Sequence, residues 1–323
     1  MIQETKAALF FPGQGLPPKD IITCYERLNA FDPKQVGQRL TLAQEAINRV
    51  HGSAAFKIAD ALADDKSPNF GQTAFVQPVV YALSVLTSEI TDAHSVARIG
   101  PSYVAGHSLG EYSALTRAGV MSYEDGIDIV TFRGQVMEEA CQKNKSVLLR
   151  ISGLTEAVVR KMCTHSEGRT IAEVALINAP TLIVVGCAAE VASDVDKLAK
   201  AAGARGATDL GTAGAFHTSF MQTAQEKLDR KLFEYYFKDP EIPVVTNFSG
   251  QPIYSRLQAQ DHLVESICNP VQWAKTLAYL QSSGVAVFGE VGPGTSLAAL
   301  NKINGIPEAQ TINVLSWSQS RDF

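Results

Sequence analysis

Y-V-A-G-H-S-L-G-E-Y-S-A-L, residues 103–115, runs from a short apolar segment through a glycine-flanked serine into a helix-forming segment. This order predicts a strand, a sharp turn and a helix, with Ser108 at the apex of a G-x-S-x-G turn. The glycines let strand and helix pass closely, and the serine is strained with its hydroxyl exposed. The N–H groups and dipole of the following helix favour negative charge at the same point. Ser108 is therefore the candidate nucleophile; the alternative is a tight turn that contains a serine by chance.

The composition is that of an ordinary globular chain. Its 323 residues are 46% apolar and 19% charged, enough to bury a large core in one big domain or two smaller ones. The net charge of −5, without a basic block, argues against nucleic-acid binding. The polar N-terminus leads directly into a predicted strand, and no apolar run approaches membrane-spanning length. We therefore expect a cytoplasmic location, with neither a membrane nor a nucleic acid as partner.

The cysteines and histidines indicate no metal site. Five cysteines are scattered without a C-x-x-C pair, as is usual for reduced thiols of a cytosolic protein. His51, His94, His165 and His262 have no ligand spacing with these cysteines and are expected at the surface or its boundary. We expect no bound metal and no bound cofactor.

A strand predicted at Ala7–Phe11 ends in the turn Pro12-Gly13-Gln14-Gly15. The turn leaves an amide side chain and free N–H groups at the carboxyl end of a strand, where α/β sheets place their active sites. The alternative is a plain β-turn. Helices are expected at Thr41–Val50 and Thr73–Leu86, with Pro78 in the first turn of the second, where proline is tolerated.

The next predicted helix, Ser122 to about Cys141, carries Arg133 on its apolar side. At about 100° per residue, Arg133 shares a face with Ile129, Val130, Phe132, Val136, Met137 and Ala140. A guanidinium stays charged, so it must pair with a buried carboxylate, extend to the surface at a domain edge, or face a cavity that binds an anion. Its planar set of donors suits a carboxylate ligand.

Residues from about 146 to 207 follow a different pattern. The predicted order is strand Val147–Ile151, helix Thr155–Cys163, strands Val174–Ile177 and Thr181–Val185, helix Ala189–Ala202 and strand Thr208–Leu210. Asn178-Ala179-Pro180 is the expected hairpin turn between the middle strands. This β-α-β-β-α-β order is typical of a ferredoxin-like unit.

The larger pattern resumes at Gly214-Ala215-Phe216-His217, before a helix predicted to end near Tyr236. His217 lies at a loop-to-helix junction, an exposed position that suits a general base. The alternative is a histidine that caps or packs against the helix start. The remaining predicted elements are strand Ile242–Thr246, helix Val271–Leu280, a last core strand Ala286–Val291 and helix Ser296–Ile303, with no assignment beyond Gly305.

The predicted fold class is therefore α/β. Residues 1–144 and 208–323 are expected to form a large α/β-hydrolase-like domain with a parallel sheet, and residues 145–207 an inserted small ferredoxin-like (βαββαβ) domain. A lipase-type hydrolase would need its triad in the order serine, aspartate, histidine, for which Asp261 and His262 are candidates. That alternative leaves the insertion and Arg133 unexplained.

Six motifs together resemble the malonyl-CoA:acyl carrier protein transacylase family, which includes the acyltransferases of polyketide synthases. They are F-P-G-Q-G at 11–15, G-H-S-L-G-E-Y-S-A-L at 106–115, R-G-x-x-M at 133–137, A-F-H at 215–217, N-P-V-x-W at 269–273 and E-V-G-P-G at 290–294. The resemblance runs from residue 7 to about residue 303 and implies Ser108 as nucleophile and His217 as its base. It implies that the N–H groups of Gln14 and Leu109 form the oxyanion hole and that Arg133 holds the malonyl carboxylate.

The resemblance also implies a substrate pocket lined by His107, Gln77, Asn178 and Phe216. Phe216 matches the form of its motif that accompanies malonyl rather than methylmalonyl groups. A thioester acyl group would move from coenzyme A to Ser108 and then to a carrier's phosphopantetheine thiol. The implied partners are malonyl-CoA and an acyl carrier protein, and because such carriers are acidic we expect a local basic face from Arg160, Lys161, Lys197, Lys200 or Arg205.

Two departures from the family pattern accompany the resemblance. The chain has Leu16-Pro17-Pro18-Lys19 where the family continues with Ser-Gln and a Gly-Met pair, and Ser266 where a glutamine is common. These changes favour a discrete acyltransferase of a polyketide or hybrid assembly line. The alternative functions are an editing thioesterase that removes acyl groups from carriers, for which a fixed carboxylate clamp has no use, and a non-enzymatic scaffold that docks carriers and tolerates Ser108→Ala.

Overall fold

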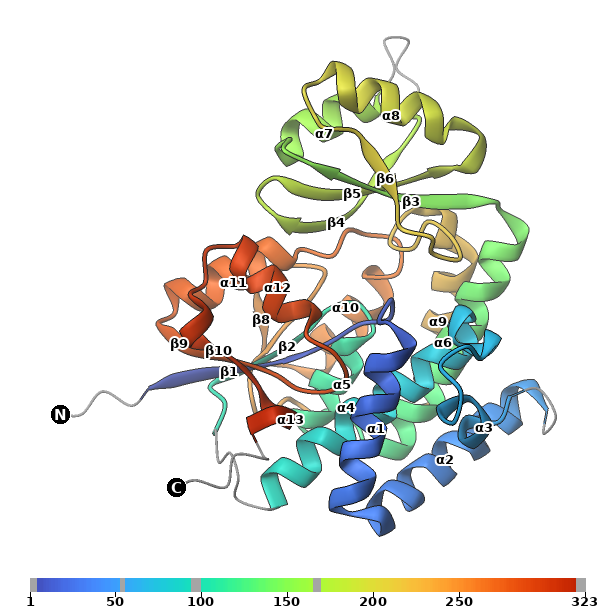
Figure 1. Cartoon of the computed structure of the whole chain (residues 1–323), viewed down its shortest axis with the longest axis vertical. Coiled ribbons are helices and arrows are strands. Elements are labelled where there is room, and N and C mark those ends of the chain that lie inside the picture. Colours follow the sequence, from blue (N-terminus) through green and yellow to red (C-terminus); the bar gives the residue numbers. More distant parts are fainter. Residues whose placement is uncertain (1–4, 53–55, 94–99, 165–169, 318–323) are drawn as a thin grey trace.

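The computed structural model describes residues 5–52, 56–93, 100–164 and 170–317, and its elements form two sheets (Figure 1). The predicted strands before and after the serine-containing turn lie together in the large sheet, whose order is β10-β9-β1-β2-β7-β8. All its neighbouring strands are parallel except β7 and β8. Its strands are β1 (Lys6–Phe11), β2 (Tyr103–Gly106), β7 (Val244–Val245), β8 (Pro252–Ile253), β9 (Val285–Glu290) and β10 (Thr311–Asn313).

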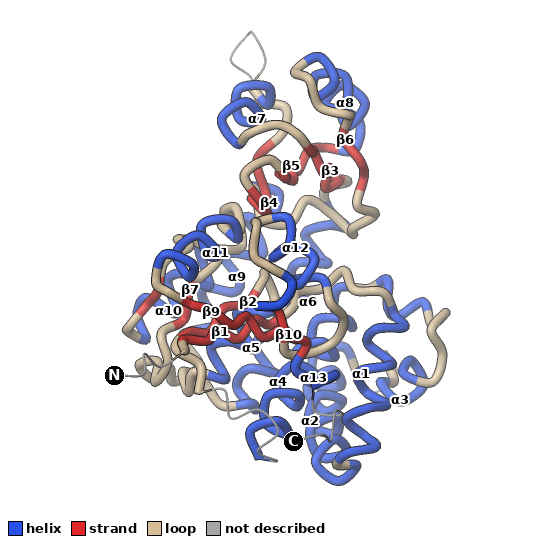
Figure 2. The backbone as a smooth tube through the Cα atoms, turned by 60° about the vertical axis from the view of Figure 1, so that its left-hand side comes forward, coloured by secondary structure: helices blue, strands red, loops and turns tan. Residues whose placement is uncertain are grey.

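Helices cover both faces of the large sheet. Helices α4 and α5 lie on one side, and α11 and α12 lie on the other (Figure 2). β1 is buried from Ala7 to Phe11, as expected for a strand covered on both faces. The helices of this part are α1 (Pro18–Phe31), α2 (Pro33–His51), α3 (Ile58–Leu62), α4 (Thr73–Ala93), α5 (Gly110–Arg117), α6 (Tyr123–Lys143), α9 (Gln222–Leu232), α10 (Arg256–Glu265), α11 (Trp273–Ser282), α12 (Ser296–Ile303) and α13 (Val314–Trp317).

Helix α4 corrects one expectation from the sequence. The segment Thr73–Asp92 is long and apolar enough to cross a membrane, so the expectation that no run approaches that length is wrong. In the fold, 94% of its most apolar 18-residue stretch is buried, because α4 packs against α2, α5 and α6. The helix is therefore apolar because it lies in the core. Pro78 is its sixth residue, beyond the first turn in which the sequence placed it.

The small sheet has the β-α-β-β-α-β order that the sequence predicts. Its elements are β3 (Ser146–Ser152), α7 (Glu156–Cys163), β4 (Glu173–Ala179), β5 (Leu182–Ala188), α8 (Ala192–Ala201) and β6 (Ala207–Asp209). The strands lie in the order β4-β5-β3-β6, and every neighbouring pair is antiparallel. Helices α7 and α8 cover the face that points away from the large sheet (Figure 1).

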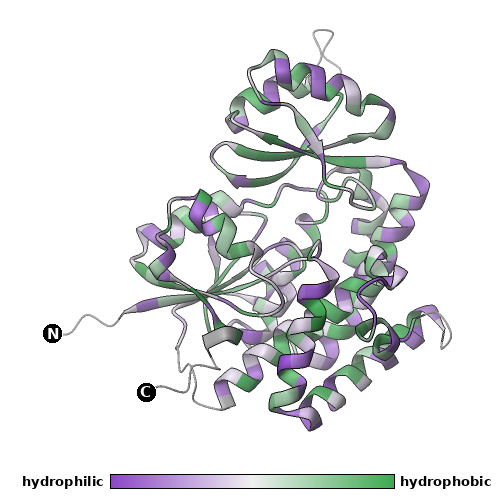
Figure 3. Ribbon diagram, in the orientation of Figure 1, coloured by the Kyte–Doolittle hydropathy of each residue, from purple (hydrophilic) through white to green (hydrophobic). Residues whose placement is uncertain are grey.

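Alternation along these strands divides their side chains between two cores. In β3, Leu149 belongs to the small core beneath α7 and α8, whereas its neighbour Leu148 belongs to the large core. In β5, Val185 and Val184 divide in the same way. Most strands of both sheets are mainly hydrophobic (Figure 3), because adjacent residues face opposite sides and both sides are covered; β6, at the edge of the small sheet, is the more exposed one.

The outer edge of β4 is tied to the large part of the chain by its backbone. The N–H of Val271 donates to the C=O of Ala175 at 3.0 Å, and the N–H of Ile177 donates to the C=O of Val271 at 2.9 Å. Val271 therefore extends the small sheet, and the helix predicted from Val271 begins at Trp273 instead. This contact places the end of β4 beside the carboxyl ends of the large sheet's strands.

Several predicted boundaries also differ from the structure. Asn178 and Ala179 belong to β4, so the hairpin turn consists of Pro180 and Thr181. β10 adds a strand beyond β9, which the sequence identified as the last. The other differences are α2, which begins at Pro33, α9, which follows a 3-10 turn at Ser219–Met221 and ends at Leu232, and β7, which is shortened to Val244–Val245.

Candidate active site

Ser108 lies in the turn between β2 and α5, as predicted, with a left-handed φ of 52°. The two glycines of the turn are required by close contacts. A Cβ on Gly106 would lie 1.9 Å from the carbonyl carbon of Gly110, and a Cβ on Gly110 would lie 2.0 Å from the carbonyl oxygen of Phe11. The strand and the helix therefore approach too closely for any side chain, and this approach fixes the position of the serine.

His217 lies 109 positions after Ser108 in the sequence, and its side chain contacts the serine hydroxyl. Its Nε2 lies 2.7 Å from the Oγ of Ser108, and its Nδ1 lies 2.6 Å from the carbonyl oxygen of Ser266. A carbonyl only accepts, so Nδ1 carries the proton and Nε2 accepts from the serine hydroxyl. The partner of His217 is thus a backbone carbonyl, which any residue at position 266 supplies. His217 is 2% exposed, so the expectation of an exposed histidine is wrong.

Burial also governs the charge of this histidine. Loss of solvent, and then the neighbouring charge of Arg133, lower the pKa of His217 from 6.5 to about 3, against the effect of its bond to Ser266. The imidazole is therefore neutral over the whole physiological range. A neutral Nε2 in contact with a hydroxyl is the arrangement that a general base requires.

Arg133 extends from α6 to the same point and is 1% exposed. Its Nη1 donates to the Oε1 of Gln77 at 2.7 Å, and its Nη2 donates to the Oγ of Ser108 at 3.4 Å. Its Nε has no partner, and in the described part of the chain no carboxylate lies within ion-pair distance of it. Burial lowers the pKa of Arg133, although a guanidinium remains protonated at neutral pH. The structural ion pair considered from the sequence is therefore absent from the described residues, and a buried positive charge faces the nucleophile.

Other residues singled out from the sequence surround this group. The Nε2 of Gln77 donates to the Oε1 of Gln14 at 3.0 Å, so Gln77 links Arg133 to the turn after β1. Leu109 directly precedes α5, and Phe216, which precedes His217, is buried.

The small sheet contributes one further side chain. The Oδ1 of Asn178, in β4, lies 2.9 Å from the Nε2 of His107. The ring of His107 packs edge-on against Trp273, with ring centroids 5.4 Å apart. The side chain of Asn178 is therefore directed toward His107, at the junction of the two sheets.

The remaining candidates lie elsewhere. His262 bonds to the Oγ1 of Thr246 at 2.7 Å, and the histidine in contact with Ser108 is His217, which contradicts the lipase-type triad. Among the described residues, no group of His, Cys, Asp and Glu is arranged to hold a metal ion. His94 and His165 fall outside the described residues. All five cysteines are free thiols.

The cations expected to face a partner lie mainly on the small sheet's outer helices. Lys197 and Lys200 pair with Asp194 and Asp196 along α8, on the side away from the large sheet (Figure 1). Arg160 of α7 lines a hollow of about 420 Å³ that also includes Cys268, Asn269 and Pro270 from the large part of the chain.

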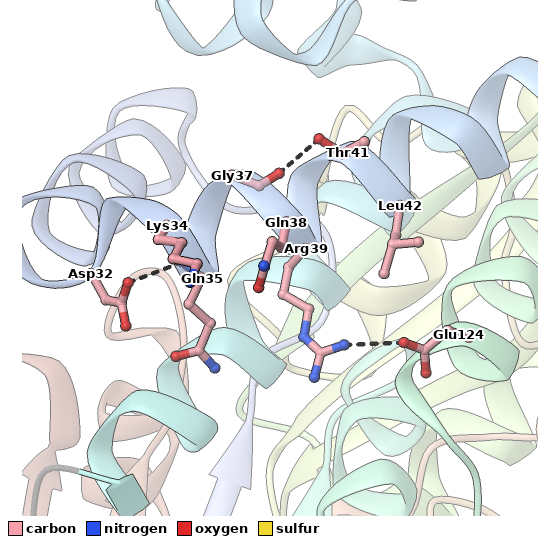
Figure 4. A pocket seen from close by; sticks show the side chains of 9 residues that line it. All are labelled: Asp32, Lys34, Gln35, Gly37, Gln38, Arg39, Thr41, Leu42 and Glu124. Atoms are coloured by element: carbon pink, nitrogen blue, oxygen red, sulfur yellow. Dashed lines mark hydrogen bonds and ion pairs between the residues drawn. The ribbon is translucent and has the colours of Figure 1, made fainter.

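A larger hollow of about 890 Å³ runs along α2 (Figure 4) and includes none of the residues around Ser108. Its arginine, Arg39, is paired with Glu89 and Glu124. The guanidinium of Arg39 is therefore already paired within the protein.

Two buried polar residues behind the serine were not singled out from the sequence. Glu111 and Asn247 are 1% and 2% exposed, and they bond to each other. Glu111 directly follows the second glycine of the turn, and this adjacency to the serine motif could have marked it as a candidate site residue. Asn247 follows a two-residue strand, which gives no comparable signal.

Comparisons with known proteins find relatives over most of the chain. Residues 39–315 match the family model described as acyl transferase domain. The chain is 35% identical over 296 residues to the polyketide biosynthesis protein ThaF of Burkholderia thailandensis, which covers 91% of this chain but 24% of that protein. It is 30% identical over 322 residues to the malonyl CoA-acyl carrier protein transacylase of Staphylococcus aureus strain MW2, covering 98% of this chain and 99% of that one.

Solved structures give the same result. A complex of a type II PKS acyl-carrier protein with its malonyl-transacylase contains a chain that superposes with a TM-score of 0.84 at 26% identity, covering 98% of this chain and 100% of that one. An acyl carrier protein S-malonyltransferase from Vibrio cholerae O1 biovar eltor superposes with a TM-score of 0.81 at 27% identity, covering 95% of this chain and 96% of that one.

Proposed function

The chain belongs to the malonyl-CoA:acyl carrier protein transacylase family, and we propose that it transfers a malonyl group from coenzyme A to the phosphopantetheine thiol of an acyl carrier protein. The observation that carries the proposal is the meeting of three side chains from different elements. The hydroxyl of Ser108 lies 2.7 Å from the imidazole of His217 and 3.4 Å from the guanidinium of Arg133, which has no ion-pair partner among the described residues.

The chemistry proceeds in two equivalent halves. Nε2 of His217 accepts the Oγ proton as Ser108 attacks the thioester carbonyl, and an oxygen–carbon bond forms. The N–H groups of Gln14 and Leu109 stabilise the oxyanion of the tetrahedral intermediate. Its collapse breaks the carbon–sulfur bond, and the departing coenzyme A sulfur takes the proton from His217. The carrier thiol then attacks the malonyl-serine by the same steps.

Arg133 selects the acyl group. Its unpaired Nε and its Nη2 offer two parallel donors to the free carboxylate of a malonyl group, in the geometry that guanidinium and carboxylate groups prefer. A neutral acyl chain would leave this buried charge without a partner, which disfavours its binding. Gln77 fixes the orientation of the guanidinium, and His107, Asn178 and Phe216 line the remaining space.

The partner and the pathway follow from the family. The proposed partner is an acyl carrier protein of fatty-acid or polyketide synthesis, acting in the cytoplasm. We also propose that residues 145–207 form an inserted ferredoxin-like domain, and that residues 1–144 and 208–323 form one α/β-hydrolase-like catalytic domain. In this division the separate core beneath α7 and α8 belongs to the insertion, and Asn178 is its contribution to the substrate pocket.

Intact-protein mass measurement tests the proposal. The protein is incubated with malonyl-CoA or acetyl-CoA, and then with a phosphopantetheinylated carrier. We expect a durable malonyl adduct on Ser108 that passes to the carrier, and no adduct on Ser108→Ala. Rapid release of free acid would instead identify an editing thioesterase, and carrier binding without any adduct would identify a docking scaffold.

A further inference from the structure

The side chain of Asn247 forms hydrogen bonds with the backbone of Ser108, although 139 positions separate the two residues. Its Oδ1 accepts the N–H of Ser108 at 3.1 Å, and its Nδ2 lies 3.5 Å from the C=O of Ser108. Both backbone groups of the serine are thus met by one side chain. The C=O of Ser108 also accepts the backbone N–H of Glu111 at 3.1 Å, whereas the N–H of Ser108, in its left-handed conformation, has Asn247 as its acceptor.

Glu111 determines which way this amide faces. One carboxylate oxygen accepts from the Nδ2 of Asn247, and the other accepts the backbone N–H of Asn247 at 3.3 Å. An ionised carboxylate only accepts, so the Nδ2 of Asn247 must face Glu111. Its Oδ1 is then directed at the N–H of Ser108, which is the group that needs an acceptor.

Because Glu111 and Asn247 are buried, a reversed Asn247 amide would be energetically costly. Burial raises the pKa of Glu111 to about 7, while both hydrogen bonds from Asn247 and the charge of Arg133 lower it. Above this pH the carboxylate is ionised and fully engaged by Asn247. A reversed amide would place two donors against each other at Ser108 and two acceptors against each other at Glu111, with no water to relieve either contact.

We propose that Asn247, oriented by Glu111, is a positioning residue that holds Ser108 in its left-handed conformation and so determines the reactivity of the hydroxyl. The proposal rests on Ser108 being the nucleophile of the proposed transfer. It does not depend on the identity of the acyl group. Neither Asn247 nor Glu111 touches the reacting atoms, and both act through the backbone of the serine.

Exchanging the two side-chain types tests the proposal. Glu111→Gln and Asn247→Asp each preserve shape but oppose like groups. The double variant restores a donor facing an acceptor between positions 111 and 247 and keeps an acceptor for the N–H of Ser108, while the C=O of Ser108 retains the backbone N–H of residue 111. Labelling of Ser108 by phenylmethanesulfonyl fluoride near pH 8 is measured by intact mass. In this reaction the Oγ–sulfur bond forms, fluoride leaves and the hydroxyl proton passes to His217. We expect each single variant to label about 100-fold more slowly, and the double variant to recover to within about tenfold of wild type.

A matched control separates positioning from general stability. Tyr81→Phe removes another buried hydrogen bond, from Tyr81 to Thr116 at 2.8 Å, and should lower the melting temperature without slowing the labelling. Folded single variants that label at the wild-type rate would overturn the proposal. A double variant whose labelling rate falls by the product of the two single-variant factors would overturn it as well. If the single variants do not fold, the double variant is decisive: soluble protein that labels supports the proposal, and soluble protein that does not overturns it. Wild-type protein that labels but accepts no malonyl group would contradict the proposed function alone.

Discussion

Ser108 and His217 have φ angles of 52° and 62°, the two positive values found at non-glycine residues in the described ranges, and their side chains meet at 2.7 Å. Such a conformation costs about 1 to 2 kcal/mol per residue. Strain of this kind persists only where surrounding contacts fix it, and both residues here are fixed by hydrogen bonds from distant elements. The two strained positions are therefore one feature of the fold, which directs a hydroxyl and an imidazole at each other.

The buried neutral state of His217 predicts how stability depends on pH. Its pKa is about 3 in the folded protein and 6.5 as an ordinary histidine, so below pH 6.5 the unfolded chain binds a proton that the folded chain refuses. Stability is thus lost as pH falls below 6.5, by up to about 1.4 kcal/mol per pH unit from this group. Urea unfolding of wild type and His217→Gln between about pH 7 and pH 5 should show the variant gaining relative to wild type. Parallel curves would contradict the low pKa.

Removal of Arg133 predicts a change of substrate. Arg133→Ala should lower kcat/KM for malonyl-CoA by at least about 100-fold, because it removes the partner of a buried carboxylate. Transfer of an acetyl group should increase, since a neutral chain no longer leaves a buried charge unpaired. Competition between the two thioesters, read on the carrier, measures both effects in one assay.

The matched control for this substitution is Arg117→Ala. Arg117 pairs with Asp92 at 3.1 Å and takes no part in the proposed chemistry, so its removal should leave selectivity unchanged. Unchanged malonyl preference in Arg133→Ala would remove Arg133 from the mechanism.

The same arginine predicts a conflict between stability and function. A buried guanidinium with one short hydrogen bond and an unpaired Nε is costly to the folded state. Arg133→Met fills similar volume without the charge and should raise the free energy of unfolding by about 1 kcal/mol or more, while malonyl transfer is lost. Denaturant unfolding alongside the adduct assay measures both. A variant less stable than wild type would show that the charge is compensated in the folded protein.

Much of this site could be predicted from the sequence because its decisive features are local. The spacing of glycines around Ser108 indicates a turn that only glycine permits, and helical periodicity alone puts Arg133 on a buried face. Both positions agree with the structure. The β-α-β-β-α-β order was also readable, since its three longer strands, β3, β4 and β5, are short and mainly apolar segments.

The features that residue patterns alone do not predict depend on distant contacts. The carbonyl that orients His217 belongs to Ser266; the family resemblance implies a backbone carbonyl near this position, but such a group leaves no trace in residue identity. His217 was expected to be exposed because it lies at a loop-to-helix junction, but it is buried and bonds to Ser108 and to the carbonyl of Ser266. β10 is three residues long and is a strand only because β9 lies beside it. Such pairing is set by tertiary structure and not by local preference.

The last prediction concerns the glycines of the turn at Ser108. They can be substituted without changing any of the reacting side chains. Gly110→Ala would place a Cβ 2.0 Å from the carbonyl oxygen of Phe11, a backbone atom that can move only if β1 and α5 separate. We expect this substitution to lower the free energy of unfolding by about 3 kcal/mol or more and to abolish labelling of Ser108. Gly37→Ala is the matched control: this glycine lies inside α2 with nothing within 4 Å of the added Cβ, so alanine should stabilise the protein by up to about 1 kcal/mol and leave labelling unchanged. Urea unfolding and sulfonyl fluoride labelling of the two variants give the comparison. A Gly110→Ala protein as stable as wild type would mean that β1 and α5 are not held at the distance that positions the serine.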